Sequence, residues 1–484
     1  MRSLLIAAAI SVALSAAQAR EPAQKVIVDT DGDSDYDDVV AVMTAAVSPE
    51  LQLLGVVVTG KDGERRARTV AKALTIVGRD DVGVYVGEPP ISPEPSFPYM
   101  SQFPKRLHQL WPHLEKWARH FEYQRPAESG VDFYLARLAQ FPSEVSVIVT
   151  GPLSTLGRAL QVADERGMGL SFRRAIRQVL FSGGDFDTAE YNVYSDVGAA
   201  RLVFRSGVTV YQFGGEGKAK AYVSYDYRQR LWAAQTPATW ALQDLYRLWQ
   251  AGWDPESPFV PILYDPYPVA FLIDRERIGQ FEPMAVDVDA QGHLVRTRGA
   301  PNAHVRVSGQ GERVVEFVVK RLTSPLPPAT NHLRALKRSA GSGARELSAA
   351  VDSVLQRLAD GRGIGRAGQA RLLDSLQPKV AALRRGRAHA EWHLQMAREF
   401  LLGESRPHPW KDPYTPRFIA LSMPLYETWG VATRAAGLVA RHRTVTATVI
   451  VLTGLAFGLA AQRLRASRRR SRKRNAKGAG HGDR

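Results

Sequence analysis

Six aspartates stand within ten residues near the start of the chain, in the run DTDGDSDYDD. The run begins at the end of residues 25–29, KVIVD, whose apolar letters predict a buried strand. Ionised carboxylates at such close range raise one another's pKa, and a hard divalent cation with oxygen ligands removes that cost. Capping the helix that follows needs only one aspartate, so the run predicts a metal site. Its members are Asp29, Asp31, Asp33, Asp35, Asp37 and Asp38.

Two other aspartate-rich motifs fit this run less well. An EF-hand calcium loop needs glycine at its sixth position and glutamate at its twelfth, and the run meets neither demand whether it is counted from Asp29 or from Asp31. A haloacid dehalogenase-type phosphatase resembles VIVDTDGDS, with Asp29 as nucleophile and Asp31 as acid. Asp33 stands where that family has threonine or valine, so the phosphatase is the weaker alternative.

The aspartate run also resembles the N-terminal motif of inosine-uridine-type nucleoside hydrolases, in the variant that reads DTD, two residues, Ser-Asp, one residue, DD. Four later segments are similar to landmarks of that family and come in its order. They are IVTGPLSTLGRAL (148–160), QVLFSGGDF (178–186), AEYNVYSDVGAARLVF (189–204) and YDPYPVAFLID (264–274). The resemblance covers about residues 25–322.

The resemblance implies a Ca²⁺-dependent enzyme that hydrolyses the N-glycosidic bond of ribonucleosides or of a related ribosyl compound. Its metal ligands would be the carboxylates of Asp31, Asp38 and Asp265 and the backbone carbonyl of Thr150. Ca²⁺ takes about six to eight oxygen ligands, so this set leaves room for a water and two sugar hydroxyls. Asp31 would be the base that takes the proton while the metal-activated water attacks the anomeric carbon.

Sugar-binding and leaving-group roles follow from the same resemblance. Asp37, Glu190 and Asn192 would bind ribosyl hydroxyls. Tyr264 stands where many relatives have the histidine that protonates the leaving base. A phenol has a pKa of about 10, so at neutral pH it is a weaker acid than the imidazole of a histidine. This departure keeps open a second hypothesis, a catalytically silent receptor or scaffold that binds a ribosyl ligand on the same fold.

The order of the predicted elements favours an α/β fold. Apolar β-branched runs alternate with helical patterns, which is typical of a mostly parallel sheet flanked by helices. We therefore expect a nucleoside hydrolase-like domain over residues 20–322. The predicted strands are residues 25–29, 53–59, 83–86, 145–150, 178–181 and 208–212, and the predicted helices include 38–47, 64–78, 132–140 and 196–206.

A helical region is predicted to follow over residues 323–443. Its part from 331 to 403 has the pattern of amphipathic helices, broken near residues 361–365. Two interpretations stay open, a helical hairpin that packs on the enzyme domain and a self-association element that makes a homo-oligomer. One apolar face consists of Leu347, Val351, Val354, Leu355 and Leu358.

The two ends of the chain predict an exported, single-pass membrane protein. Residues 1–19 have one arginine, a short apolar stretch and small residues at the expected cleavage site, as a signal peptide does. The uncharged stretch 445–461 predicts a transmembrane helix over residues 444–464. The tail 465–484 would then be cytoplasmic, and the catalytic domain would lie on the periplasmic or extracellular side.

Charge and composition restrict the partners. Residues 463–484 hold ten Lys or Arg against one Asp, which is +9 of the formal +16 of all 484 residues. A polybasic run directly after a predicted span indicates contact with anionic membrane lipid rather than with nucleic acid. The chain has no cysteine, so an exported domain must be stabilised by its core and by any bound metal.

Overall fold

A computed structural model describes residues 22–32, 35–92, 123–214, 220–252, 261–341, 344–360 and 364–403. All of them belong to one compact unit, Met1–Asp412. The predicted signal peptide 1–19, transmembrane helix 444–464 and basic tail 465–484 lie outside the described residues. Among the residues that are described, no helix is long and apolar enough to cross a membrane.

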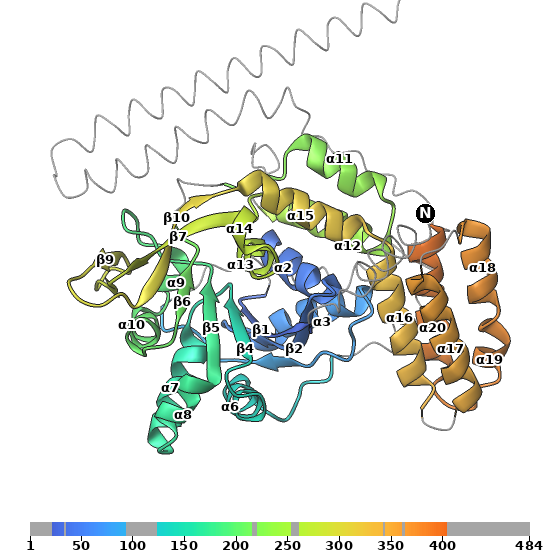
Figure 1. The fold of residues 1–484 in the computed structure, drawn as a ribbon, viewed down its shortest axis with the longest axis horizontal. Helices are drawn as coiled ribbons and strands as arrows, with labels where there is room; N and C mark the ends of the chain where they lie inside the picture. The colour runs from blue at the N-terminus through green and yellow to red at the C-terminus, as the bar shows by residue number, and fades with distance from the viewer. Residues whose placement is uncertain are drawn as a thin grey trace, which may run out of the picture. The chain divides into compact units, whose positions relative to one another are not determined.

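Eight strands form one sheet in the order β3-β2-β1-β4-β5-β6-β10-β7 (Figure 1). Neighbouring strands run parallel except β10 and β7, which are antiparallel. The expected mostly parallel sheet is therefore confirmed. The strands are β1 (Gln24–Thr30), β2 (Leu51–Val58), β3 (Val84–Val86), β4 (Val145–Val149), β5 (Ile176–Phe181), β6 (Val210–Gln212), β7 (Gly279–Met284) and β10 (Ala303–Gly309), while β8 (Val286–Val288) and β9 (Leu294–Arg296) pair separately.

Helices cover both faces of the sheet, which explains why the central strands β1 and β4 are buried over most of their length. Along β1, Val26 and Val28 enter one core cluster and Ile27 enters the other, because successive side chains point to opposite faces. Helices α2 (Tyr36–Val47), α3 (Gly63–Ile76), α11 (Tyr225–Ala233), α12 (Pro237–Gly252), α13 (Pro266–Ile273) and α15 (Gly311–Thr323) contribute to the first cluster. Helices α6 (Gly130–Gln140), α7 (Ser154–Glu165), α8 (Gly169–Ala175) and α10 (Val197–Arg205) contribute to the second (Figure 1).

The chain changes direction across the sheet between β1 and β4. From β1 it proceeds to β2 and β3 on one side, and it then returns to β4 on the other side. The carboxyl ends of β1 and β4 are level, since Asp29 pairs with Val149. In open parallel sheets, ligands bind outside the carboxyl ends of the strands at such a switch point. The aspartate run and Thr150 both follow these two strand ends.

Five further helices form a layer with its own core. They are α16 (Leu326–Ser339), α17 (Arg345–Ala359), α18 (Arg366–Asp374), α19 (Gln377–Ala381) and α20 (Arg387–Leu402). The expected apolar face of α17 is buried in this core, with Leu355 only half buried. The predicted break near residues 361–365 lies between α17 and α18.

The helical layer packs on the end of α3, which is the first of the two interpretations left open by the sequence. Backbone carbonyls in the last turn of a helix lack partners within the helix. Here His332 Nε2 donates to the carbonyl of Ile76 at 2.9 Å, and Asn331 Nδ2 donates to that of Val77 at 3.2 Å. Two side chains of α16 therefore satisfy the carboxyl end of α3.

Candidate metal and substrate site

Three buried carboxylates meet at the carboxyl edge of the sheet. Asp37 and Asp38 lie in the first turn of α2, and Asp265 directly precedes α13. One carboxylate oxygen from each lies within 4.8 Å of the others. All donors in the group are oxygens, the ligands that hard cations such as Ca²⁺ and Mg²⁺ prefer. The donor set therefore fits a divalent hard cation.

The backbone near Asp31 adopts an unusual shape that brings this strand end close to the end of β4. Gly32 has φ +72°, a conformation in which glycine has no steric cost. A Cβ added to Gly151 would come within 2.7 Å of the Asp31 backbone nitrogen. The two glycines thus allow the chain after β1 to turn tightly against the chain after β4.

Asp37 connects the first turn of α2 to the segment before α13. Its Oδ2 accepts hydrogen bonds from the backbone N–H groups of Tyr264 at 2.8 Å and Asp265 at 3.2 Å. The sequence assigned Asp37 to a sugar hydroxyl. The structure places it within the carboxylate group, where it also fixes the position of Asp265.

Asp38 is held by hydroxyl groups at the ends of β1 and β4. Thr30 Oγ1 donates to its Oδ1 at 2.7 Å, and Thr150 Oγ1 lies 3.5 Å from the same oxygen. Its Oδ2 accepts the Asp35 backbone N–H at 3.2 Å as part of the capping box of α2. The Asp31 carboxylate lies close enough to Asp38 for its charge to raise the pKa of that residue.

Residues that the sequence did not single out position Asp31 and Asp265. Ser182, which follows β5, donates from Oγ to Asp265 Oδ1 at 2.9 Å. Arg66 of α3 donates to the Asp31 backbone carbonyl, and its Nη1 lies 4.0 Å from the Asp31 carboxylate. Ser182 lies inside the matched SGGDF segment and could have been inferred. No sequence signal connects Arg66 with an aspartate 35 residues away.

Burial controls the electrostatics of the carboxylate group. It raises the pKa of Asp37, Asp38 and Asp265 well above the ordinary aspartate value, and the neighbouring carboxylates raise it further. Like charges at this range cannot all be ionised without a nearby cation. A bound divalent cation would favour the ionised forms, so the pKa directions agree with the donor chemistry.

The carboxylate of Asp29, near the end of β1, is fixed by two hydroxyl groups. Thr59 Oγ1 donates to its Oδ1 at 2.6 Å, and the Tyr134 hydroxyl donates to its Oδ2 at 2.9 Å. Burial raises the pKa of Asp29 to about 7, although these two hydrogen bonds oppose the shift. Both oxygens of Asp29 are thus engaged away from the carboxylate group, and the residue connects β1 with β2 and α6.

Two of the predicted sugar-binding residues, Glu190 and Asn192, lie at the start of a short helix, α9 (Tyr191–Tyr194). Glu190 caps it by accepting the backbone N–H groups of Asn192 at 3.0 Å and Val193 at 3.3 Å, and it also accepts that of Gly184 at 2.7 Å. Such a cap orients the carboxylate rigidly. Three backbone N–H groups already donate to the Glu190 carboxylate. Only its remaining lone pairs can therefore accept a hydrogen bond from a sugar hydroxyl.

Asn192 is tied to two strand ends. Its Nδ2 donates to the carbonyls of Thr150 at 3.0 Å and Ser182 at 2.8 Å, which uses both amide hydrogens. Its Oδ1 is buried and has no hydrogen-bond partner among the described residues. This oxygen can accept a hydrogen bond from a hydroxyl group. The Thr150 carbonyl retains a second lone pair for a cation.

Tyr264 lies beside the carboxylates through its backbone, and its side chain is half buried. The positive charge of Arg306 lies near Tyr264. Burial lowers the pKa of Arg306, and Tyr264 is one of two tyrosines that partly offset this shift. The Arg306 guanidinium lies over the Tyr267 ring at 4.6 Å and donates to the Gly214 carbonyl at 3.2 Å. Arg306 is a third residue that the sequence did not single out, after Ser182 and Arg66.

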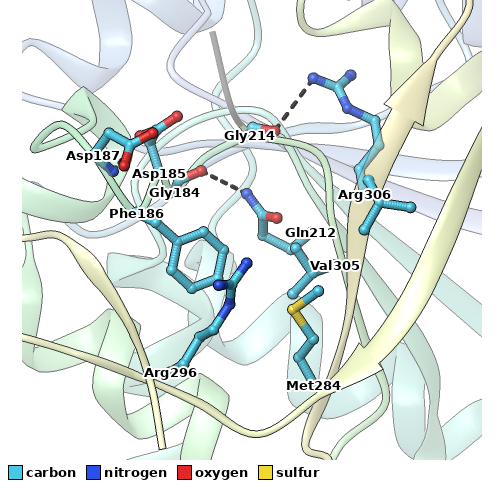
Figure 2. A pocket seen from close by; sticks show the side chains of 11 residues that line it. Gly184, Asp185, Phe186, Asp187, Gln212, Gly214, Met284, Arg296, Val305 and Arg306 are labelled. Carbon is cyan, nitrogen blue, oxygen red and sulfur yellow. Dashed lines mark hydrogen bonds between the residues drawn. The ribbon is translucent and has the colours of Figure 1, made fainter. Parts of the chain in front are cut away.

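A small cavity of about 120 Å³ lies beside the SGGDF segment (Figure 2). Asp185 and Asp187 stand on one side of it and Arg306 on another, and Gln212 Nε2 donates to the Gly184 carbonyl at 2.5 Å. Ligand pockets usually measure at least about 300 Å³. The cavity is therefore too small to enclose a nucleoside by itself.

Comparison with known proteins gives one family and several relatives. The model of the family described as "Inosine-uridine preferring nucleoside hydrolase" matches residues 26–321. A pyrimidine-specific ribonucleoside hydrolase from Citrobacter koseri is 24% identical over 60% of this chain and 96% of its own length. Uridine nucleosidase 1 from Arabidopsis thaliana is 26% identical over 56% of this chain and 80% of its own length.

Solved structures show the same fold. A plant nucleoside hydrolase superposes with a TM-score of 0.52 at 21% identity, covering 63% of this chain and all (100%) of its own. A purine-preferring ribonucleoside hydrolase from Gardnerella vaginalis superposes with a TM-score of 0.50 at 23% identity, covering 62% of this chain and 98% of its own.

Proposed function

Because the chain belongs to the inosine-uridine preferring nucleoside hydrolase family, we propose that it hydrolyses ribonucleosides with the help of Ca²⁺ bound at the carboxylate group. The family makes it an N-glycosyl hydrolase. The observation that carries the metal part is the approach of Asp37, Asp38 and Asp265 to within 4.8 Å of one another. These residues come from distant parts of the chain and lie at the switch point of the sheet, where ligands bind in such folds.

The cation would be held by Asp31, Asp38, Asp265 and the Thr150 carbonyl, and also by Asp37, whose place within the carboxylate group supports this role. When bound, Ca²⁺ would orient a water and the ribosyl hydroxyls and would lower the pKa of that water moderately. Ser182 and Asn192 support this arrangement by fixing Asp265 and the Thr150 carbonyl.

Asp31 would act as the base. It takes a proton from the water that attacks the anomeric carbon, while the bond from that carbon to the nitrogen of the leaving nucleobase breaks. Arg66 holds the backbone at Asp31 and so limits the positions of this carboxylate. The ribosyl ring gains positive charge in the transition state, and the surrounding carboxylates stabilise that charge.

The sugar and the leaving base would be bound by residues on two sides of the carboxylates. Asn192 Oδ1 accepts a sugar hydroxyl, because it is buried and has no other partner in the described structure. Glu190 accepts a second hydroxyl from its capped position. Tyr264 would donate a hydrogen bond to the leaving base, with Arg306 behind it to stabilise developing negative charge.

The names of the relatives indicate which substrates to try first. One is pyrimidine-specific and another is a uridine nucleosidase. We therefore propose pyrimidine ribonucleosides as the first substrate class, with a related ribosyl compound as the alternative. The export signal, membrane helix and basic tail predicted from the sequence would place this activity outside the cytoplasm.

Ribose release is the direct test. The full-length chain, purified in mild detergent, is incubated with Ca²⁺ and with uridine, cytidine, inosine or nitrophenyl riboside, and reducing sugar is measured. We expect release from at least one substrate, and none from Asp38→Ala or after chelation. Asp226→Asn changes an exposed aspartate on α11 and should match the wild type.

A ribosyl-ligand receptor is the second candidate, since Glu190 and Asn192 are engaged mainly by backbone groups. If the wild type releases no ribose from any of these substrates yet binds them in a Ca²⁺-dependent manner, the receptor replaces the hydrolase.

A further inference from the structure

Two histidines of α20 and one aspartate after α3 point at one another on the far side of α3 from the carboxylate group. His389 Nε2 lies 3.1 Å from Asp80 Oδ2, and His393 Nε2 lies 3.2 Å from the same oxygen. The histidines are four residues apart and share one face of the helix. Ligand-capable atoms of all three residues lie within 4.8 Å of one another.

Hydrogen bonds fix which nitrogen of His393 carries a proton. The Ile76 carbonyl only accepts, so His332 donates to it from Nε2. In neutral His332 the Nδ1 atom is then an acceptor, and it lies 3.0 Å from His393 Nδ1, which must be the donor. His393 Nε2 therefore presents a lone pair to Asp80 Oδ2, which is also an acceptor.

Two acceptors that face each other at 3.2 Å need a positive species between them. That species is either a proton, which would make His393 an imidazolium, or a metal ion. His393 is fully buried, and burial disfavours a charged imidazolium.

The distances suit a metal ion. Zn²⁺ binds imidazole nitrogen and carboxylate oxygen at about 2.0–2.2 Å, so two tetrahedral ligands lie roughly 3.3 Å apart. The two separations from Asp80 Oδ2 are 3.1 and 3.2 Å. The side chain of His389 is 41% exposed, so water can reach the group and complete the coordination.

The surroundings are built as they are around known metal sites. A histidine that binds a metal donates its other ring nitrogen to an acceptor, as His393 does to His332. Arg338 Nη2 donates to Asp80 Oδ1 at 2.8 Å, which turns Oδ2 toward the histidines. The charge of Arg338 would oppose a cation, but the guanidinium also binds Asp81 Oδ1 at 3.2 Å.

We propose that Asp80, His389 and His393 form a second metal site, for a transition-metal dication such as Zn²⁺, that fastens α20 to the segment after α3. Two imidazoles and one carboxylate are the donors of a borderline metal, whereas the carboxylate group at the sheet has only oxygens. The two sites therefore select different metals. The second site is structural, because it joins the helical layer to the sheet domain.

The test uses the full-length chain, freed of metal with a chelator and kept in excess Ca²⁺ so that Zn²⁺ does not enter the carboxylate group. Calorimetric titration should show one Zn²⁺ bound per chain, and Zn²⁺ should raise the thermal midpoint. Co²⁺ in place of Zn²⁺ should give the visible absorption of a tetrahedral nitrogen and oxygen site.

The variants are chosen so that folding is preserved. His389→Gln alters an exposed side chain and should weaken Zn²⁺ binding at least tenfold, and Asp80→Asn should do the same. Glu391→Gln changes a carboxylate on the same helix outside the group and should bind as the wild type does. If the wild type binds Zn²⁺ no better than both site variants, a proton on His393 fills this position and the proposal is wrong.

Discussion

The carboxylate of Asp37 accepts the backbone N–H of Tyr264 at 2.8 Å, although 227 residues separate them. The first turn of α2 is thereby joined to the segment that carries both Asp265 and the candidate leaving-group donor. Any change that moves Asp37 should therefore also move Tyr264. The proposed metal ligand Asp265 and the proposed leaving-group donor Tyr264 therefore share one support, the Asp37 carboxylate.

Removing Asp38 should abolish the response of the protein to Ca²⁺. A ligand that binds only the native state stabilises it by mass action, by about 2.7 kcal/mol at a concentration one hundred times its Kd. We expect Ca²⁺ to raise the thermal midpoint of the wild type and to leave that of Asp38→Ala unchanged. A wild-type midpoint that is the same with Ca²⁺ and with chelator would contradict the calcium site.

Replacing Asp31 with asparagine should remove the catalytic base but keep the size and shape of the side chain. Hydrolysis should fall by about 100-fold or more, with little change in substrate binding. Asp265→Ala should lower both Ca²⁺ affinity and rate, since alanine removes a proposed ligand, whereas asparagine at position 31 keeps a ligand oxygen. Steady-state rates and calorimetric Ca²⁺ binding separate the two effects. Equal losses of Ca²⁺ affinity in both variants would show that Asp31 is only a ligand.

Tyr264→Phe tests assistance to the leaving base. A nucleoside base leaves more easily when it receives a hydrogen bond, whereas nitrophenolate needs none. The variant should therefore be slower on uridine and unchanged on nitrophenyl riboside. The ratio of the two rates is the measurement. An unchanged ratio would restrict Tyr264 to packing.

Lys72, buried in α3, should make stability depend on pH. Burial lowers its pKa from 10.5 to about 7, so between these values the unfolded chain binds more protons and stability rises with pH. The effect is on the order of 5 kcal/mol at most across that window. In Lys72→Met, the denaturation midpoint should change less with pH between pH 7 and about 10. Lys320→Met, at an exposed lysine, should keep the wild-type slope; parallel curves for wild type and Lys72→Met would refute the shift.

Reporter fusions test the predicted membrane topology. A reporter that is active only outside the cytoplasm should work when fused near residue 330 and fail when fused after Arg484. The reverse pattern would contradict the predicted signal peptide and membrane helix. Deleting residues 463–484 should weaken the orientation preference, because the positive charges hold the tail in the cytoplasm.

The sequence by itself predicted six of the eight strands of the central sheet and the acidic run at its edge. Strands such as β1 and β4 are buried on both faces, so they appear as continuous apolar runs, and the predicted strands match β1 to β6. Strand β7 was missed because it alternates exposed and half-buried residues and contains Pro283, which weakens the strand pattern. Asp38 and Asp265 could be paired in advance only because the motif order of a family connects them.

Only the tertiary structure decided which side chains fix those ligands and which other groups meet. Asp37 lies among the metal donors because α2 packs beside the segment before α13. Asp80 meets His389 across 309 residues, in a helical layer where the sequence indicated only amphipathic helices. Hydrophobic periodicity fixes which face of a helix is buried, but it carries no information on which polar groups the packing of two distant elements will bring into contact.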